Sequence, residues 1–302
     1  MRPRHLRAAL FSLLGLVTAA AACGSSAVSA GASVAAANPD ARPDDHGLRG
    51  PLLWEVQGEH APSYLFGTIH AGFRADKELP GWVWDKLRAC DTFVMETDLG
   101  EVDTAEMSRL SALPAGQSLA AMMGPDDWKD LIDLTGMPES TLSTHQPWFA
   151  ATLVLQRLYP TPVPLDLALM RRAGELGKEV AFLEDMKRQV DVLARTVTID
   201  DLRDLVRADG KGRRQTAALL AAYRAGDLER MAGVVHEELA SDPQGYELLY
   251  SARNRDWLPK LKAHIERGRA FVAVGAAHFP GEGGLIELLR ADGYVLTRVV
   301  AP

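Results

Sequence analysis

The feature of this sequence that most limits its fold is a motif that occurs twice, a short apolar run followed by Gly-x-x-His. Residues 64–70 read Tyr-Leu-Phe-Gly-Thr-Ile-His, and residues 271–278 read Phe-Val-Ala-Val-Gly-Ala-Ala-His. A short apolar run bounded by glycine or proline is typical of a buried parallel strand. The histidine then follows the carboxyl end of the strand, where open α/β sheets bind their ligands. If the two strands are neighbours, His70 and His278 lie at the same edge of the sheet.

Each motif is followed by the same succession of expected elements. After the first histidine the pattern predicts a helix over residues 78–89 and a strand over 92–96; after the second it predicts a helix over 284–291 and a strand over 294–299. A strand, helix, strand succession favours a parallel sheet with right-handed crossovers. The expected fold is α/β, with a mixed, mostly parallel central sheet built from two β-(GxxH)-α-β units.

The rest of the chain adds a hairpin and a large helical insertion. Residues 52–56 and 63–66 alternate apolar side chains around a turn, which predicts a hairpin that provides an antiparallel edge. Residues 102–158 and 186–267 have predominantly helical patterns. We expect the second helical region to lie between a strand at 179–183 and the strand of the second motif.

Two glutamates are predicted at the same edge of the sheet as the histidines. Glu96 ends the strand that follows the first motif, and Glu184 follows the strand at 179–183. Two imidazoles with a carboxylate are a familiar ligand set for a catalytic metal. Such ligands without thiolate suit Zn, Mn, Co or Fe. The alternative for each histidine alone is a structural residue, and for each glutamate a helix cap or an ion pair with Arg253.

Arg253 belongs to the last long helical segment, on one face with Trp257. It is either a buried ion-pair arginine or a group that clamps a carboxylate or stabilises an oxyanion, since a planar guanidinium suits these tasks. Glu184 has a corresponding functional alternative, that of a general base or an orienting group.

Charge and motif content argue against several classes of function. The chain has 33 Lys and Arg against 40 Asp and Glu, a formal net charge of −7, and its basic residues are scattered. Nucleic-acid binding needs a basic stripe, so no nucleic acid is expected as a partner. The sequence also has no Gly-x-Ser-x-Gly elbow and no His-Glu-x-x-His helix. The sequence therefore lacks the motifs that usually indicate a serine hydrolase or a zincin.

The amino terminus is expected to be a targeting segment. A basic stretch at residues 2–7 precedes an apolar stretch at 8–22 that is too short for a membrane-spanning helix, which predicts a signal peptide over residues 1–22. The run Ala-Ala-Ala-Cys-Gly then resembles a bacterial lipobox, so we expect Cys23 to carry a lipid that anchors the protein to a membrane.

The segment that follows the lipobox is expected to be a flexible tether. Residues 23–50 hold almost no large apolar side chain and cannot bury enough surface to fold. The folded domain is then expected over residues 51–302. We predict that the chain is exported across the bacterial inner membrane and becomes a periplasmic or outer-membrane lipoprotein.

Several short motifs together resemble the TraB/GumN family. They are Gly67-Thr68-Ile69-His70, Val94-Met95-Glu96-Thr97, Gln146-Pro147-Trp148, Leu183-Glu184 with Gln189, Arg253-Asn254 with Trp257, and Gly275-Ala276-Ala277-His278 with the glycines and leucines after it. The resemblance covers about residues 52–299. That family includes the Tiki-type metalloproteases and is related to the ChaN and erythromycin-esterase folds.

The resemblance implies a divalent-metal site, with Mn, Co or Zn as the ion. On this chain it places His70, Glu96 and His278 at the metal and Glu184 and Arg253 in the pocket as catalytic residues. It implies a metal-dependent hydrolase, a peptidase of the cell envelope acting on a peptide or protein. The alternative is a non-catalytic envelope protein that binds a peptide signal, haem or a metal. A scaffold with a decayed site is disfavoured, because all the motif residues are present.

The lipobox generates the first prediction. We expect mass spectrometry of the mature protein to find residues 1–22 removed and a diacyl or triacyl modification on Cys23, because two or more chains are needed for stable anchoring. An unmodified mature terminus at any other residue would contradict the lipoprotein assignment and leave export intact.

Overall fold

The computed structural model describes residues 50–100, 103–207, 210–239 and 242–301. The expected signal peptide, Cys23 and the tether as far as residue 49 lie outside these ranges. None of the helices in the described ranges is long and apolar enough to cross a membrane.

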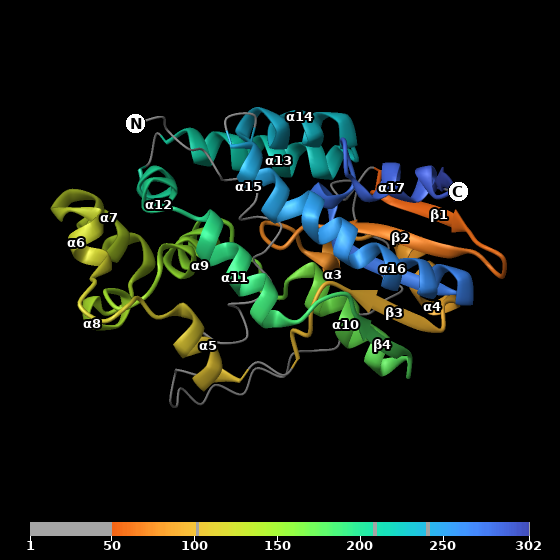
Figure 1. The fold of residues 1–302 in the computed structure, drawn as a ribbon, viewed down its shortest axis with the longest axis horizontal. Coiled ribbons are helices and arrows are strands. Elements are labelled where there is room, and N and C mark those ends of the chain that lie inside the picture. The colour runs from red at the N-terminus through yellow and green to blue at the C-terminus, as the bar shows by residue number, and fades with distance from the viewer. Residues whose placement is uncertain (1–49, 101–102, 208–209, 240–241, 302) are drawn as a thin grey trace.

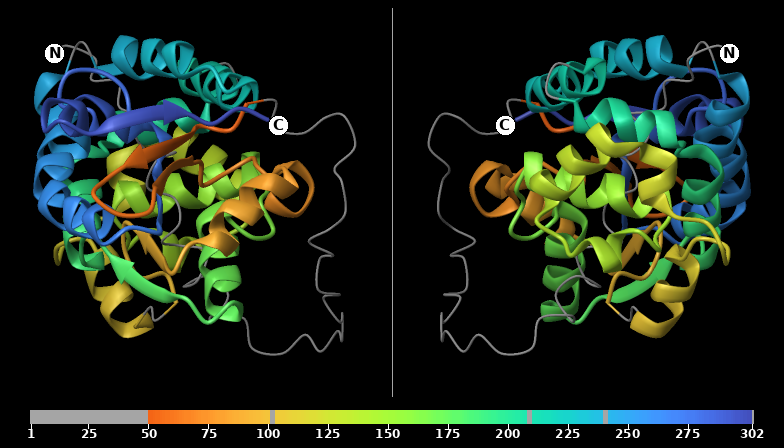
Figure 2. Two further views of the ribbon diagram at one scale, coloured as in Figure 1. Left: turned by 90° about the vertical axis from the view of Figure 1, so that its right-hand side faces the viewer. Right: turned by 90° about the vertical axis from the view of Figure 1, so that its left-hand side faces the viewer.

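The described residues form a six-stranded sheet in the order β4-β3-β5-β2-β1-β6. The strands are β1 (Leu53–Gln57), β2 (Ser63–Thr68), β3 (Thr92–Met95), β4 (Glu179–Phe182), β5 (Ala270–Gly275) and β6 (Val295–Arg298). Strands β4, β3, β5 and β2 are parallel, whereas β1 is antiparallel to both of its neighbours. Figure 2 shows β4 and β6 at opposite edges. The predicted α/β fold with a mixed, mostly parallel sheet is confirmed.

The strand pairing differs from the sequence expectation at one edge of the sheet, and it shows a strand order that the sequence did not specify. The β1–β2 hairpin forms, but β6 pairs with β1, so β6 rather than the hairpin is the antiparallel edge. The two strands of the first β-α-β unit are also not neighbours, because β5 lies between β2 and β3. Strands β2, β3 and β5 are buried along their whole length. Strands buried on both faces have similar apolar patterns, so nothing in these patterns specifies the neighbour of each strand.

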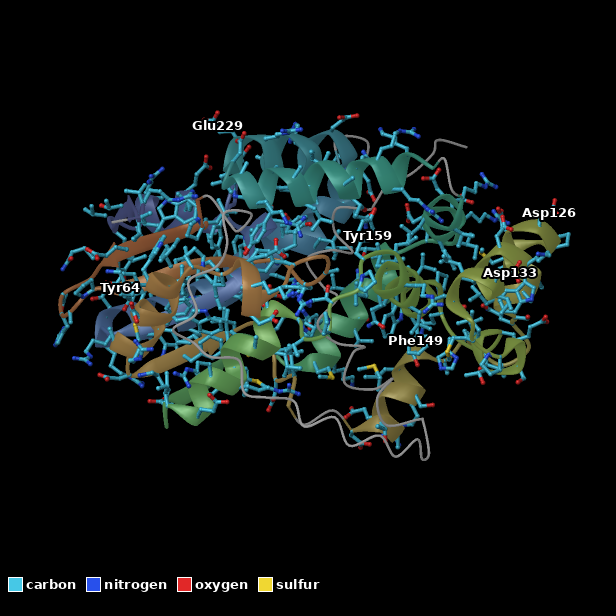
Figure 3. All side chains as sticks on the ribbon, turned by 180° about the vertical axis from the view of Figure 1, so that it is seen from behind. Tyr64, Asp126, Asp133, Phe149, Tyr159 and Glu229 are labelled. Atoms are coloured by element: carbon cyan, nitrogen blue, oxygen red, sulfur yellow. The ribbon has the colours of Figure 1, made fainter. Side chains whose placement is uncertain are left out.

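Helices cover both sides of the sheet and extend beyond one end of it (Figures 1 and 2). Those that precede β4 are α3 (Ala75–Glu78), α4 (Gly81–Ala89), α5 (Thr104–Ser111), α6 (Leu119–Met123), α7 (Pro125–Thr135), α8 (Glu139–Leu142), α9 (Pro147–Leu158) and α10 (Leu165–Glu175). In Figure 3, Asp126 and Asp133 of α7 lie at the opposite end of the molecule from Tyr64 of β2.

The predicted helical insertion between β4 and β5 is present. It comprises α11 (Met186–Thr196), α12 (Ile199–Val206), α13 (Lys211–Ala225), α14 (Leu228–Leu239), α15 (Pro243–Tyr246), a π-helical turn (Glu247–Ser251) and α16 (Ala252–Arg267). After β5 come a 3₁₀ turn (Ala276–His278) and α17 (Leu285–Ala291). Helix α16 runs across the strands in Figure 1.

Local sequence signals explain several helix ends. The helix expected over residues 78–89 begins only at Gly81, as α4, because Pro80 lacks the N–H that a helix interior needs and stands at the cap instead. Thr198 and Asp201 form a capping box at the start of α12. Gly226, with φ 68°, ends α13 in the left-handed conformation that glycine favours.

The two Gly-x-x-His motifs pack directly against each other. The strand register pairs Gly67 with Val274. A Cβ atom on Gly67 would lie 2.9 Å from the Cβ of Ala276 and 3.0 Å from a ring carbon of Phe279. The hydroxyl of Tyr223 donates to the Gly67 carbonyl at 2.9 Å. Glycine in the first motif is therefore what allows the turn of the second motif to approach so closely.

This contact predicts that Gly67→Ala lowers the free energy of unfolding by about 1–3 kcal/mol, the usual cost of overpacking a core. Gly81→Ala is the matched control, because a Cβ on Gly81 meets nothing within 4 Å. Urea unfolding measures both variants. Equal stability of the two variants would show that the motifs do not need this close approach.

Candidate active site

The carboxyl ends of the four parallel strands bring polar side chains to one edge of the sheet. His70 follows β2, His278 follows β5, Glu96 follows β3 and Glu184 follows β4. The first three residues are 6%, 0% and 4% exposed. The backbone hydrogen bonds between β3 and β4 continue past the ends of the two strands, since the Glu184 N–H donates to the Glu96 carbonyl at 2.8 Å. The fold therefore gathers the four residues at the edge of the sheet where the sequence placed them.

His70 is held by a carboxylate that the sequence analysis missed. Its Nδ1 atom lies 2.5 Å from Oδ2 of Asp166, and the Thr68 hydroxyl donates to the other oxygen of Asp166 at 2.6 Å. Burial alone would raise the pKa of Asp166, but His70 and Thr68 outweigh burial and lower this pKa below its usual range. An ionised carboxylate only accepts hydrogen bonds, so Nδ1 of His70 carries the proton.

A sequence signal for Asp166 does exist. The residue is in the first turn of α10, on one helix face with the buried Leu169 and Ala173, three and seven residues later. A carboxylate aligned with the apolar face of a helix is expected to have a buried partner. Acidic residues are common in first turns for other reasons, which hides this signal.

His278 is held in a similar way by an amide. Its Nδ1 atom lies 2.7 Å from Oδ1 of Asn254, whose Nδ2 donates to the carbonyls of His278 and Gly283 at 3.1 and 2.8 Å. Oδ1 is thus the acceptor, so Nδ1 of His278 donates and Nε2 carries a lone pair. Burial, together with Arg253 and His70, lowers the pKa of His278 well below its usual value.

Arg253 lies at the centre of a buried ion-pair network. It is fully buried, and its Nη2 atom donates to Glu96 at 2.7 Å and to Glu184 at 2.6 Å. Nη1 donates to Nε2 of His278 at 3.1 Å. The guanidinium lies 4.6 Å from the ring centroid of Trp257, whose Nε1 also donates to Glu184. The structure therefore shows a buried ion-pair arginine with Glu184 as its partner.

Glu96 accepts hydrogen bonds on both oxygens. Oε1 accepts from the Gly275 N–H at 2.7 Å, and Oε2 accepts from Nε2 of Gln189 at 3.1 Å in addition to Arg253. Burial raises the pKa of Glu96, while Arg253 acts in the opposite direction. Glu96 Oε1 is 4.0 Å from Nε2 of His278. The glutamate after β3 is therefore bound to the backbone that opens the second Gly-x-x-His turn.

The three predicted metal ligands have the supporting contacts of a metal site, but their side chains do not converge. Histidines that bind a metal usually donate their second ring N–H to a carboxylate or carbonyl, as His70 and His278 do. Arg253, however, stands between His278 and Glu96 and donates to both. Across the described ranges, no three His, Cys, Asp or Glu side chains are arranged to hold a metal ion. The donor set therefore fits a divalent ion only if Arg253 releases these contacts.

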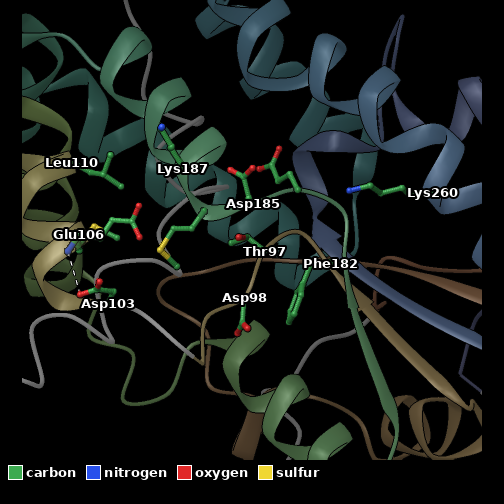
Figure 4. Close-up of a pocket in the computed structure, with 12 residues that line it drawn as sticks. Thr97, Asp98, Asp103, Glu106, Leu110, Phe182, Asp185, Lys187 and Lys260 are labelled. Carbon is green, nitrogen blue, oxygen red and sulfur yellow. Dashed lines mark hydrogen bonds between the residues drawn. The ribbon is translucent and has the colours of Figure 1, made fainter.

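A cleft of about 440 Å³ opens beside this network (Figure 4). It is lined by residues that follow β3 and β4, including Thr97, Asp98 and Glu184, and by residues of α5. The carboxylate of Glu184 thus binds Arg253 and also belongs to the wall of the cleft. A volume of this size is typical of small-molecule sites.

The fold and the paired motifs define a class of α/β proteins, and comparison with known proteins names it. The model of the TraB/PrgY/gumN family matches residues 52–298, and the chain belongs to this family. "Uncharacterized protein YbaP" of Shigella flexneri is 28% identical over 76% of this chain and 88% of that protein. "Metalloprotease TIKI2" of Danio rerio is 25% identical over 80% of this chain and 60% of that protein. No solved structure matches the chain significantly.

The network predicts a large stability loss when the arginine is removed. Arg253→Met leaves Glu96 and Glu184 buried without their cation, so the free energy of unfolding should fall by about 3–5 kcal/mol. Arg188→Met is the control, because Arg188 forms an exposed pair with Asp256 and its loss should cost less than about 0.5 kcal/mol. Denaturant unfolding checks both values. A loss as small as that of the control would mean that the buried pairs do not hold the centre together.

Proposed function

We propose that the protein is a metal-dependent hydrolase that cleaves peptide bonds. The observation that carries this proposal is the pair of histidines at the ends of neighbouring parallel strands, each with Nδ1 committed to a buried acceptor. Membership of the TraB/PrgY/gumN family and similarity to a protein named as a metalloprotease support it. The expected signal peptide points to peptides or proteins of the cell envelope as substrates.

The proposed ligands are His70 and His278, through their Nε2 atoms, and Glu96. A divalent ion of Mn, Co or Zn, when bound, would supply Lewis-acid polarisation of the scissile carbonyl and would acidify a water molecule. Asp166 and Asn254 fix the tautomers and the ring planes of the two histidines, as outer partners of metal ligands do. Both partners are buried, so water does not compete for these hydrogen bonds.

Glu184 and Arg253 are the proposed catalytic residues. Glu184 extends from the buried network to the wall of the cleft, where a substrate has room to enter. A carboxylate in that position is suited to take a proton from water or to orient it. Arg253, once it releases His278 and Glu96 to the ion, would keep its pair with Glu184 and supply a permanent positive charge that stabilises negative charge developing on the substrate carbonyl.

A non-catalytic binding protein is the second candidate function. It is favoured by the contacts of Arg253, which already satisfies Nε2 of His278 and one oxygen of Glu96 without an ion. In that case the cleft would capture a peptide signal, haem or a metal without turnover. Hydrolysis of a peptide library by the wild type, and its loss in His70→Ala, would separate the two candidates.

The metal proposal predicts that both histidines act as one unit. His70→Ala and His278→Ala should each remove most of the bound metal and of the hydrolysis, and the double variant should be scarcely worse than either single variant. Metal content per folded molecule is measured by mass spectrometry after incubation with Mn²⁺, Co²⁺ or Zn²⁺. His236→Ala, at an exposed position of α14, is the matched control.

Circular dichroism verifies that each variant is folded, which is expected because the sheet core holds a domain of this size. Full metal occupancy in either single variant, or losses that add in the double variant, would show that the two motifs do not share an ion. Full occupancy of the wild type without hydrolysis of any peptide would favour the binding protein.

A further inference from the structure

The cleft beside the candidate centre is predominantly acidic. Its lining holds two lysines, Lys187 and Lys260, and five carboxylates: Asp98, Asp103, Glu106, Glu184 and Asp185. Arg253 neutralises Glu184, and Nζ of Lys260 donates to the Leu183 carbonyl at 2.7 Å. The remaining carboxylates still outnumber the lysines. A cleft with this balance attracts cations more than anions.

The charged groups share the cleft with an apolar wall. Met107 and Leu110 come from α5, Phe182 ends β4, and Met186 begins α11. Lysine and arginine side chains have the same two-part character, because their aliphatic stems pack on apolar surface while their cationic ends reach polar groups. An apolar wall with a carboxylate rim therefore suits a basic side chain.

Thr97 provides a second and independent indication of a ligand. The residue is 2% exposed and lines the cleft directly after Glu96 (Figure 4). Within the part of the chain that the structure describes, its Oγ1 atom has no hydrogen-bond partner. Native proteins rarely keep a buried hydroxyl unpaired, and a polar ligand atom that reaches Thr97 from the cleft would pair it. The position of Thr97 places that ligand between the ion-pair network and the acidic rim.

We propose that this cleft is a specificity subsite that binds a lysine or arginine side chain of a peptide substrate. The stem lies against Met107, Phe182 and Met186, the cationic end meets the carboxylates, and the Thr97 hydroxyl binds a polar atom of the same peptide. The inference rests on the proposed function, and it names the class of peptide that the site selects.

The probes are synthetic octapeptides in matched pairs, with lysine in one member and norleucine at the same position in the other. Norleucine keeps the aliphatic stem and lacks the charge. The lysine member should bind the full-length protein about tenfold more tightly than the norleucine member, because it gains one charge-assisted contact. Isothermal calorimetry measures both affinities. This preference should shrink as the salt concentration rises, because the rim of the cleft is open to solvent.

The acidic rim is tested by the double variant Asp98→Asn with Glu106→Gln. Neither residue belongs to the proposed catalytic or metal-binding groups, and asparagine still accepts the Gly100 N–H that Asp98 accepts at 2.8 Å. The double variant should lose most of the preference for lysine. Asp126→Asn with Glu229→Gln is the matched control, which removes two exposed charges that do not line the cleft and should keep the preference.

Thr97→Val separates a binding hydroxyl from a structural one. Valine keeps the shape and removes a hydroxyl that has no partner among the described residues, so the melting temperature should stay the same or rise. Binding of the lysine peptides should nevertheless weaken, by about threefold to tenfold. A fall in melting temperature with unchanged binding would assign the hydroxyl to structure and overturn its part in the subsite.

The outcomes for the subsite and for the hydrolase are distinguishable. Equal binding of the two members, binding of neither, or a preference that survives in the acidic-rim variant would overturn the subsite. Hydrolysis without preference for lysine would overturn the subsite and leave the hydrolase standing. A lysine preference that the acidic-rim variant loses, without any hydrolysis, would support the subsite and overturn the hydrolase.

Discussion

The guanidinium of Arg253 is the interaction on which the centre of this protein depends. A buried charge is tolerated only when it is paired and hydrogen-bonded. Arg253 meets this condition with groups that follow three different strands, Glu96 after β3, Glu184 after β4 and His278 after β5. Because Arg253 is fully buried and makes all of these bonds at once, the ends of the three strands and helix α16 are held in one arrangement.

Strands and helices determine different features of the histidines in the candidate centre. The strands set the positions of the histidines, since each histidine follows a strand at a similar distance. The helices set their orientations, since Asp166 comes from α10 and Asn254 from α16. Arg253 is the second residue of α16, and α16 follows a π-helical turn, a feature that is frequent at functional sites. The large helical insertion is therefore part of the centre as well as a cover for the sheet.

Much of this arrangement follows from local pattern, and the rest depends on contacts that no local pattern encodes. Apolar runs end just before His70, Glu96, Glu184 and His278, so their shared edge of the sheet was predictable. The partner of His70 was not, because Asp166 is 96 residues away in sequence and has the ordinary position of a helix-start acid. The order of the strands was not predictable either, since β2, β3 and β5 are uniformly buried and similar in pattern.

The contacts of Arg253 could not be predicted from the sequence either. A motif that includes Arg253 and Asn254 places both near the centre, but it does not show how five N–H donors are shared among the surrounding acceptors. That distribution depends on where β3, β4 and β5 end in space. It decides whether Glu96 and His278 face an ion or the guanidinium.

The place of β5 in the sheet has a consequence for the order in which the molecule assembles. Strand β5 lies between β2 and β3, yet it is synthesised after every helix of the insertion. Until it is available, β2 and β3 have no partner between them and expose backbone edges that promote misassembly. Closing so long a loop is slow compared with local helix formation. The helices are thus expected to form before the sheet, and β5, when it joins β2 and β3, completes the hydrophobic core and the ion-pair network in the same step.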